Sequence, residues 1–268
     1  MIRFVTSSCK TFLYELGTIW LFTVEVFRVF ARTQGNFHPI MAQVASVSFR
    51  TLSTVIFAGL FVGAILVLQM NLILASYDSQ SVLGGLNTST VVREIGPLII
   101  SFLLAGKIGA YTAAELGTMR VTEQVDAIEC LGTNPLQYLV VPRLIGIMIS
   151  SLILLFVGLL VSIAGAMVVA SYGCNINFTE FASSIPRFTS AWTIIGAMVK
   201  ALVYGTIVAS VSCHKGFTAS GGARGVGKAV TLAALYTNFY IVIANFLTSN
   251  FLEFIESLIE SSRGGGIS

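Results

Sequence analysis

The chain has 268 residues, of which 55% are hydrophobic and only 10% are charged, whereas a typical soluble domain carries about 25% charged residues. Its mean hydropathy is +0.88. This composition excludes an ordinary soluble domain and predicts an all-α integral membrane protein. The net charge of +3 is small, so we expect no nucleic-acid partner.

Residues 10–33 are predicted to form an amphipathic helix that lies along the membrane interface. Large apolar side chains share one broad face of this helix. They are Phe12, Leu16, Ile19, Trp20, Phe27 and Phe30. A sixth membrane span over residues 13–30 is the alternative. Glu15 and Glu25 oppose it, because a carboxylate in the middle of a bilayer costs at least ~2.5 kcal/mol.

Five later stretches are apolar enough to cross a bilayer, whose ~30 Å hydrocarbon core needs about 20 helical residues. They cover residues 51–77, 95–112, 144–172, 192–213 and 229–252. Within the first stretch, Gly59 and Gly63 form a GxxxG pattern, which is typical of closely packed membrane helices.

The positive-inside rule orients these spans with the N-terminus in the cytoplasm and, after five crossings, the C-terminus on the other side. The basic residues then placed in the cytoplasm are Arg3, Lys10, Arg28, Arg32, Arg50, Lys107, Arg120, Arg143, Lys215, Arg224 and Lys228. The opposite side holds only Arg93, Arg187 and Arg263. A glycine- and serine-rich tail over residues 261–268 is expected to be disordered.

An acidic helix is predicted over residues 113–131, between the second and third spans. Val121, Val125 and Ile128 form a narrow apolar stripe, and Glu123, Asp126 and Glu129 occupy the opposite arc. Gly132, Asn134 and Pro135 end the helix. Such a helix is a solvated linker or a docking element. The density of carboxylates favours a partner with basic pockets.

Two other patterns favour structural interpretations. Residues 222–229, GARGVGKA, match a GxxxxGK phosphate loop, but Ala229 stands where Ser or Thr would hold Mg²⁺ and no strand precedes the loop. Four cysteines and two histidines lack metal-ligand spacing. We therefore predict neither a nucleotide site nor a metal site, and no catalytic residues.

Ionisable residues near or within the spans are candidates for function because they are costly in a bilayer. Arg93 and Glu94 lie at the outer end of the second span, and Lys200 lies inside the fourth. The alternative is structural, with Arg93 paired to Glu94 and Lys200 extended toward the interface. Tyr77 is more simply an interfacial aromatic residue.

Residues 92–146 closely resemble the MlaE-type permeases, the membrane subunits of ABC transporters associated with MCE proteins. The hallmark of that family is an E-Q/E-x-D-A-L element in a cytoplasmic coupling helix. Here it reads Glu123-Gln124-Val125-Asp126-Ala127-Ile128, with Ile in place of Leu. Residues 221–231 are similar to a second family element. Asn245 stands where many relatives have Asp.

The resemblance implies a single permease domain over residues 1–268 in a bacterial inner membrane, with a periplasmic C-terminus. It implies a homodimer that binds two ABC ATPase subunits and a periplasmic MCE-protein ring. ATP and Mg²⁺ would bind the ATPases, so this chain would carry no cofactor and would not be an enzyme. The cargo would be phospholipid, moved between inner and outer membranes to maintain outer-membrane lipid asymmetry.

Site residues follow from combining the resemblance with the sequence pattern. Candidates for coupling to the ATPase are Glu115, Arg120, Glu123, Gln124, Asp126 and Glu129. Candidates for the lipid path are Leu60, Val67, Leu68, Leu72, Tyr77, Arg93, Glu94 and Lys200. The alternatives are an ion-coupled secondary transporter, in which Arg93, Glu94 and Lys200 form an ion path, and a membrane scaffold without transport.

Overall fold

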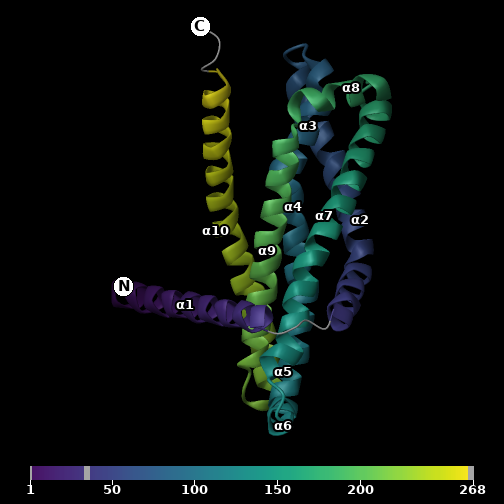
Figure 1. Ribbon diagram of the computed structural model, residues 1–268. Coiled ribbons are helices and arrows are strands. Elements are labelled where there is room, and N and C mark those ends of the chain that lie inside the picture. The colour runs from purple at the N-terminus through teal and green to yellow at the C-terminus, as the bar shows by residue number, and fades with distance from the viewer. Residues whose placement is uncertain (1, 33–36, 265–268) are drawn as a thin grey trace. The chain divides into compact units, whose positions relative to one another are not determined.

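The computed structural model describes residues 2–32 and 37–264, with side chains for residues 14–31 and 37–259. These residues are helical apart from short connections (Figure 1). Some residues named above have side chains outside the described set. They are Arg3, Lys10, Phe12, Arg32 and Arg263.

The elements follow one another with few breaks (Figure 1). The α-helices are α1 (Ile2–Arg32), α2 (Phe37–Ala75), α3 (Leu83–Thr90), α4 (Gly96–Leu104), α5 (Ala110–Val121), α6 (Gln124–Cys130), α7 (Val141–Gly173), α8 (Phe178–Phe188), α9 (Ala191–Phe217) and α10 (Gly222–Gly264). A 3₁₀ turn, η1 (Gln80–Val82), and three π-helical turns, η2 (Val91–Ile95), η3 (Ala105–Gly109) and η4 (Leu136–Val140), connect them.

Contacts divide the chain into two compact units, to which the long helices contribute separate parts. Unit 1 contains Met1–Val47, Ala105–Met148 and Thr206–Asn238, and unit 2 contains Ser48–Leu104, Ile149–Gly205 and Phe239–Ser268. Each side-chain contact and each candidate site described below lies within one unit.

Among the residues that the structure describes, four helices are long and apolar enough to cross a membrane. They lie at Phe37–Ala75, Leu136–Gly173, Ala191–Phe217 and Gly222–Ile259. They contain the predicted third, fourth and fifth spans and all but the last two residues of the predicted first span, 51–77. The predicted second span, residues 95–112, is not one long α-helix, because η3 separates α4 from α5. Five spans therefore remain a prediction.

The N-terminal segment forms the predicted helix, as α1, and packs within unit 1. Ile19, Thr23 and Val26 are buried along one stripe, while Trp20 and Phe27 stay exposed. An ion pair joins Glu15 to Lys215 near the end of α9, where Lys215 also lies over the Tyr236 ring. The apolar surface of α1 is thus only partly used by contacts within the unit.

Glycines allow α2 and α7 to approach closely in unit 2. A Cβ at Gly59 would lie 2.9 Å from the Gly158 carbonyl oxygen, and a Cβ at Gly63 would collide with the Ser162 carbonyl oxygen. The GxxxG pattern therefore serves helix packing, as small residues do in membranes. Toward one end of this unit, a buried apolar cluster includes Val67, Leu83, Ala166, Ala170, Ile176 and Phe181.

Replacing Gly63 with alanine is expected to destabilise the protein by about 1–3 kcal/mol, because the added methyl group forces two backbones apart. Denaturant titration in detergent would measure this change. Gly227→Ala is the matched control, since a Cβ at position 227 meets nothing within 4 Å. Alanine there should be neutral or stabilising through helix propensity. Equal effects at both positions would contradict the packing interpretation.

The predicted acidic helix over residues 113–131 is in fact two helices. α5 ends at Val121, and α6 begins at Gln124. Between them Glu123 has a left-handed backbone, with φ of +59°, which no continuous helix accommodates. The predicted end is confirmed, since Gly132 has φ of +76° directly after α6.

The segment that matches a phosphate loop and the start of the glycine- and serine-rich tail both lie in α10. Gly222–Ala229 forms the first turns of α10, and helix α9 precedes it rather than a strand. This segment therefore lacks the strand–loop–helix geometry of a phosphate loop. The helix α10 also extends to Gly264, four residues into the tail for which disorder was predicted, and residues 265–268 lie outside the described ones.

Candidate functional site

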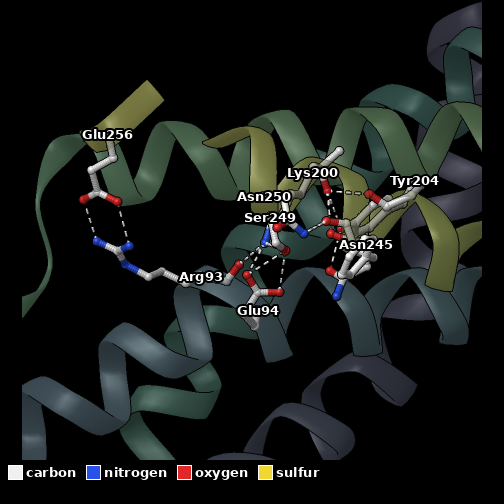
Figure 2. A network of polar contacts seen from close by, with 11 residues as sticks. Arg93, Glu94, Lys200, Tyr204, Asn245, Ser249, Asn250 and Glu256 are labelled. Atoms are coloured by element: carbon white, nitrogen blue, oxygen red, sulfur yellow. Dashed lines mark hydrogen bonds and ion pairs between the residues drawn. The ribbon is translucent and has the colours of Figure 1, made fainter. Parts of the chain in front are cut away.

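A cluster of charged and hydroxyl-bearing side chains lies inside unit 2, where η2 meets α9 and α10 (Figure 2). The π-helical turn η2 positions this cluster. In an α-helix, the Arg93 carbonyl oxygen would accept a hydrogen bond from the N–H of residue 97, but Pro97 has none. Lys200 Nζ donates to this oxygen instead, over 2.8 Å. π-turns are frequent at functional sites.

Lys200 is buried, with 2% of its side chain exposed, yet all its donors are used. Besides the Arg93 carbonyl, Nζ donates to Ser249 Oγ over 2.8 Å and forms an ion pair with Glu94. The Ser249 hydroxyl in turn lies 2.9 Å from Glu94 Oε1. An ammonium has three N–H donors, so Lys200 has no donor left for a ligand. The alternative in which Lys200 extends toward the interface is therefore not what the structure shows.

Arg93 points away from Glu94 and toward the end of α10 (Figure 2). Its guanidinium donates to both Glu256 oxygens, over 2.8 Å from Nη1 and 2.7 Å from Nη2. The alternative in which Arg93 pairs with Glu94 is therefore not what the structure shows, because the two adjacent residues have separate partners. Arg93 keeps 38% of its side chain exposed, so it is the accessible cation of the cluster.

Tyr204 extends the cluster one turn along α9 from Lys200. Its hydroxyl lies 2.7 Å from Asn245 Oδ1 and 3.1 Å from Thr248 Oγ1. On α10, Asn245, Ser249 and Glu256 are spaced i, i+4 and i+11, so they share one helix face. Sequence reasoning missed Ser249 and Glu256 as site residues. Their spacing on an otherwise apolar helix is the signal that identifies them.

A hollow of about 550 Å³ opens beside Arg93 and Glu256. Its other lining residues are Pro186, Arg187, Phe188, Ser190, Ala191, Trp192 and Ile259. Arg187 adds a second guanidinium, and Trp192 adds an aromatic surface. Such a mixture of cations and apolar groups suits an amphiphile with an anionic head.

The first-span candidates for the lipid path differ in exposure. Leu60, Leu68 and Leu72 are exposed, and Tyr77 is 75% exposed. Val67 is fully buried in the apolar cluster of unit 2, so in this structure it has no surface to offer a lipid. None of these five lines the hollow beside Arg93.

In unit 1, α6 presents the second candidate site, an acidic surface. Val125 is buried beneath the helix, as the apolar stripe predicted, and Glu123, Gln124, Asp126 and Glu129 are exposed. The Glu123 side chain does not cap α6. Asp126 is paired with Arg120 across the break between α5 and α6, which braces the turn.

Glu115 lies apart from this acidic surface. It forms an ion pair with Arg143 near the start of α7, over 3.0 Å from Nη2 to Oε2. Arg143 is only 11% exposed in its side chain and also donates from Nη1 to the Leu139 carbonyl, over 2.7 Å. Glu115 is thus paired with α7, whereas Asp126 of α6 is paired with Arg120 of α5.

Comparison with known proteins identifies the family. The family model described as "Permease MlaE" matches residues 40–251, well over half of the chain. The chain belongs to the MlaE permease family. This match includes both candidate sites of the permease except Glu256, which lies just beyond it.

Relatives of this MlaE-family permease support the assignment. A probable ABC transporter permease protein, slr1045 from Synechocystis, is 34% identical over 242 residues, covering 90% of this chain and 92% of the relative. A probable ABC transporter permease protein from Rickettsia typhi is 35% identical over 213 residues, covering 80% and 82%. The chloroplastic protein TRIGALACTOSYLDIACYLGLYCEROL 1 of Arabidopsis thaliana is 34% identical over 204 residues, covering 75% and 58%.

Proposed function

We propose that this permease is the membrane subunit of an ATP-driven lipid transporter that moves phospholipid between inner and outer membranes with an MCE protein. Two copies would pair and bind two ATPase subunits, which hold ATP and Mg²⁺. The observation that carries this proposal is the exposed acidic helix α6 on a chain of the MlaE permease family.

The surface of α6 supports docking of a separate ATPase. Glu123 adopts a left-handed backbone, which costs a non-glycine residue of order 1 kcal/mol or more. Its carboxylate makes no cap to α6 that would offset this cost. A basic partner would give the side chain a role, because charge-assisted hydrogen bonds across an interface are strong.

The proposed topology keeps five spans and a cytoplasmic N-terminus. Residues 95–112 would form the remaining span through α4, η3 and α5, because the two α-helices are joined by a π-turn rather than a loop. α1 would lie at the cytoplasmic interface, with exposed Trp20 and Phe27 in the lipid headgroup region. The C-terminus would then be periplasmic.

Three observations support a lipid cargo. The Arabidopsis relative carries the name of a lipid, trigalactosyldiacylglycerol. Leu60, Leu68 and Leu72 expose an apolar surface on α2. Arg93 and Arg187 share a hollow that also has apolar walls. A phosphate could compete with Glu256 for the exposed Arg93, whereas Lys200 is already saturated with partners.

Two substitutions at this ion pair are expected to have opposite effects on bound lipid. Arg93→Ala removes the cation and should reduce co-purified phospholipid severalfold. Glu256→Gln removes the competing carboxylate and should increase it, because a phosphate then no longer competes with Glu256 for the Arg93 guanidinium. Mass spectrometry of lipid extracts would measure both. A decrease in both variants, with a lower unfolding temperature, would mean that the pair is structural.

Reconstitution tests the whole proposal. The permease with its ATPase and MCE protein, in vesicles, should transfer fluorescent phospholipid only when ATP is supplied, and native mass spectrometry should show two permease copies per complex. Transfer driven by a proton gradient without ATPase would instead support the ion-coupled alternative. A stable complex that hydrolyses ATP without moving any lipid would remove the lipid cargo while leaving the ATPase partner.

A further inference from the structure

The chain between α5 and α7 in unit 1 forms an arch, defined here as residues 115–143. The C-terminal part of α5 is one leg, η4 with the start of α7 is the other, and α6 lies between them. The ion pair between Glu115 and Arg143 joins the two legs at their base. We infer that this pair transmits displacement of α6 into α7, making Glu115 a positioning residue rather than a docking residue.

The geometry of the pair suits transmission. Arg143 reaches Glu115 Oε2 from Nη2 over 3.0 Å and from Nε over 3.3 Å. Its Nη1 donates to the Leu139 carbonyl over 2.7 Å. One side chain therefore ties together α5, η4 and α7. The planar guanidinium holds this arrangement in a fixed geometry that lysine could not reproduce.

The α5 leg is firmly seated on the end of α9. A Cβ at Gly216 would lie 2.8 Å from Leu116 Cβ and 2.9 Å from the Ala113 carbonyl oxygen. One residue along α5, a Cβ at Gly117 would make ordinary contacts with Ala219 and Val226, at 3.4 Å. A displacement of α6 would therefore act directly on α5, which is packed against the end of α9.

The other leg packs against other elements of unit 1, since Leu139, Val140 and Val141 are buried and η4 contacts α1. Its covalent connection to α6 contains Gly132, in a left-handed backbone, followed by the π-turn η4. A hollow of about 430 Å³ separates η4 from the start of α2, lined by Gln43, Met119 and Tyr138 among others. The ion pair is a direct polar connection between the two legs, in addition to the chain that joins them through α6.

This inference rests on the proposed function, in which an ATPase moves α6. The test uses the complete transporter with Glu115→Gln, Arg143→Met and the charge exchange Glu115→Arg/Arg143→Glu. Glu15→Gln is the matched control, because it breaks another buried ion pair of unit 1, which does not join the arch. Hydrogen exchange is measured with and without a non-hydrolysable ATP analogue, together with ATP hydrolysed per lipid transferred.

In the wild type, nucleotide should change exchange in both α6 and residues 136–145. In Glu115→Gln and Arg143→Met, the change in α6 should persist while that in 136–145 falls about fivefold or more, and ATP used per lipid should rise similarly. The charge exchange should restore much of the response. Glu15→Gln should behave as the wild type in both readouts.

Three results would overturn the inference. The first is an undiminished response of residues 136–145 in Glu115→Gln. The second is loss of ATPase from the Glu115→Gln complex but not from the Glu15→Gln complex, which would make Glu115 a docking residue. The third is a wild-type α6 that does not respond to nucleotide. That outcome alone also contradicts the proposed ATPase docking, so the two failures are distinguishable.

Discussion

Replacing Lys200 with methionine is expected to lower the free energy of unfolding by about 3 kcal/mol, the lower end of the range for breaking a buried ion pair. The substitution leaves Glu94, Ser249 and the Arg93 carbonyl without their shared donor. Glu94 keeps 38% of its side chain exposed, which limits the loss. Denaturant titration of the purified permease would measure it.

The complementary variant should be less stable still. Glu94→Gln leaves the almost fully buried Lys200 ammonium without its counter-charge, and desolvation of an uncompensated charge is the larger penalty. The double variant Lys200→Met/Glu94→Gln removes both charges and should recover most of the loss. If Lys200→Met instead leaves stability intact and removes bound lipid, Lys200 is a lipid ligand.

Reversing two charges on α6 is expected to release the ATPase. With Glu123→Lys/Asp126→Lys, affinity for the ATPase should fall about 100-fold or more, corresponding to about 2.7 kcal/mol. This magnitude is reasonable because close charge pairs at interfaces measure about 1.5–7 kcal/mol in coupling energy. Binding measured in detergent, together with ATP hydrolysis by the complex, would check it.

Two further variants separate docking from folding. Glu123→Gly should stabilise the permease by up to about 1 kcal/mol, because glycine adopts positive φ without strain, and yet weaken ATPase binding. Glu180→Lys reverses an exposed carboxylate in the first turn of α8 and should leave binding unchanged. If Glu123→Gly binds ATPase as the wild type does, Glu123 is not a docking residue.

Apolar runs and helix-ending residues predicted much of the fold correctly. Four of the apolar runs lie in described helices that are long and apolar enough to cross a membrane, and Gly132 follows the end of α6 as expected. The break at Glu123 was not predictable, because glutamate is a good helix former and only the surrounding structure imposes its left-handed backbone. Likewise, hydropathy identified residues 95–112 as apolar without revealing the π-turn η3 that interrupts them.

The charged residues of the candidate sites were predicted from the sequence, but the residues that they contact were not. Arg93, Glu94 and Lys200 stood out because charges within apolar runs are expensive. Their partners did not stand out in the sequence. Arg93 and Glu256, for example, are 163 residues apart, so no local sequence pattern relates them. The burial of Val67 could not be predicted from the sequence either. A leucine-rich and valine-rich helix offers no sequence signal for which side meets a neighbouring helix and which meets lipid.

The polar face of α10 has a consequence for biogenesis. Membrane helices are synthesised from the N-terminus onward, so Arg93, Glu94 and Lys200 reach the bilayer before Ser249 and Glu256 are made. Lys200 and Glu94 can pair as soon as α9 is synthesised, whereas Arg93 cannot pair with Glu256 until α10 is synthesised. A nascent chain that stalls before α10 therefore lacks the carboxylate that pairs with Arg93, so completion of the last helix also completes this ion pair.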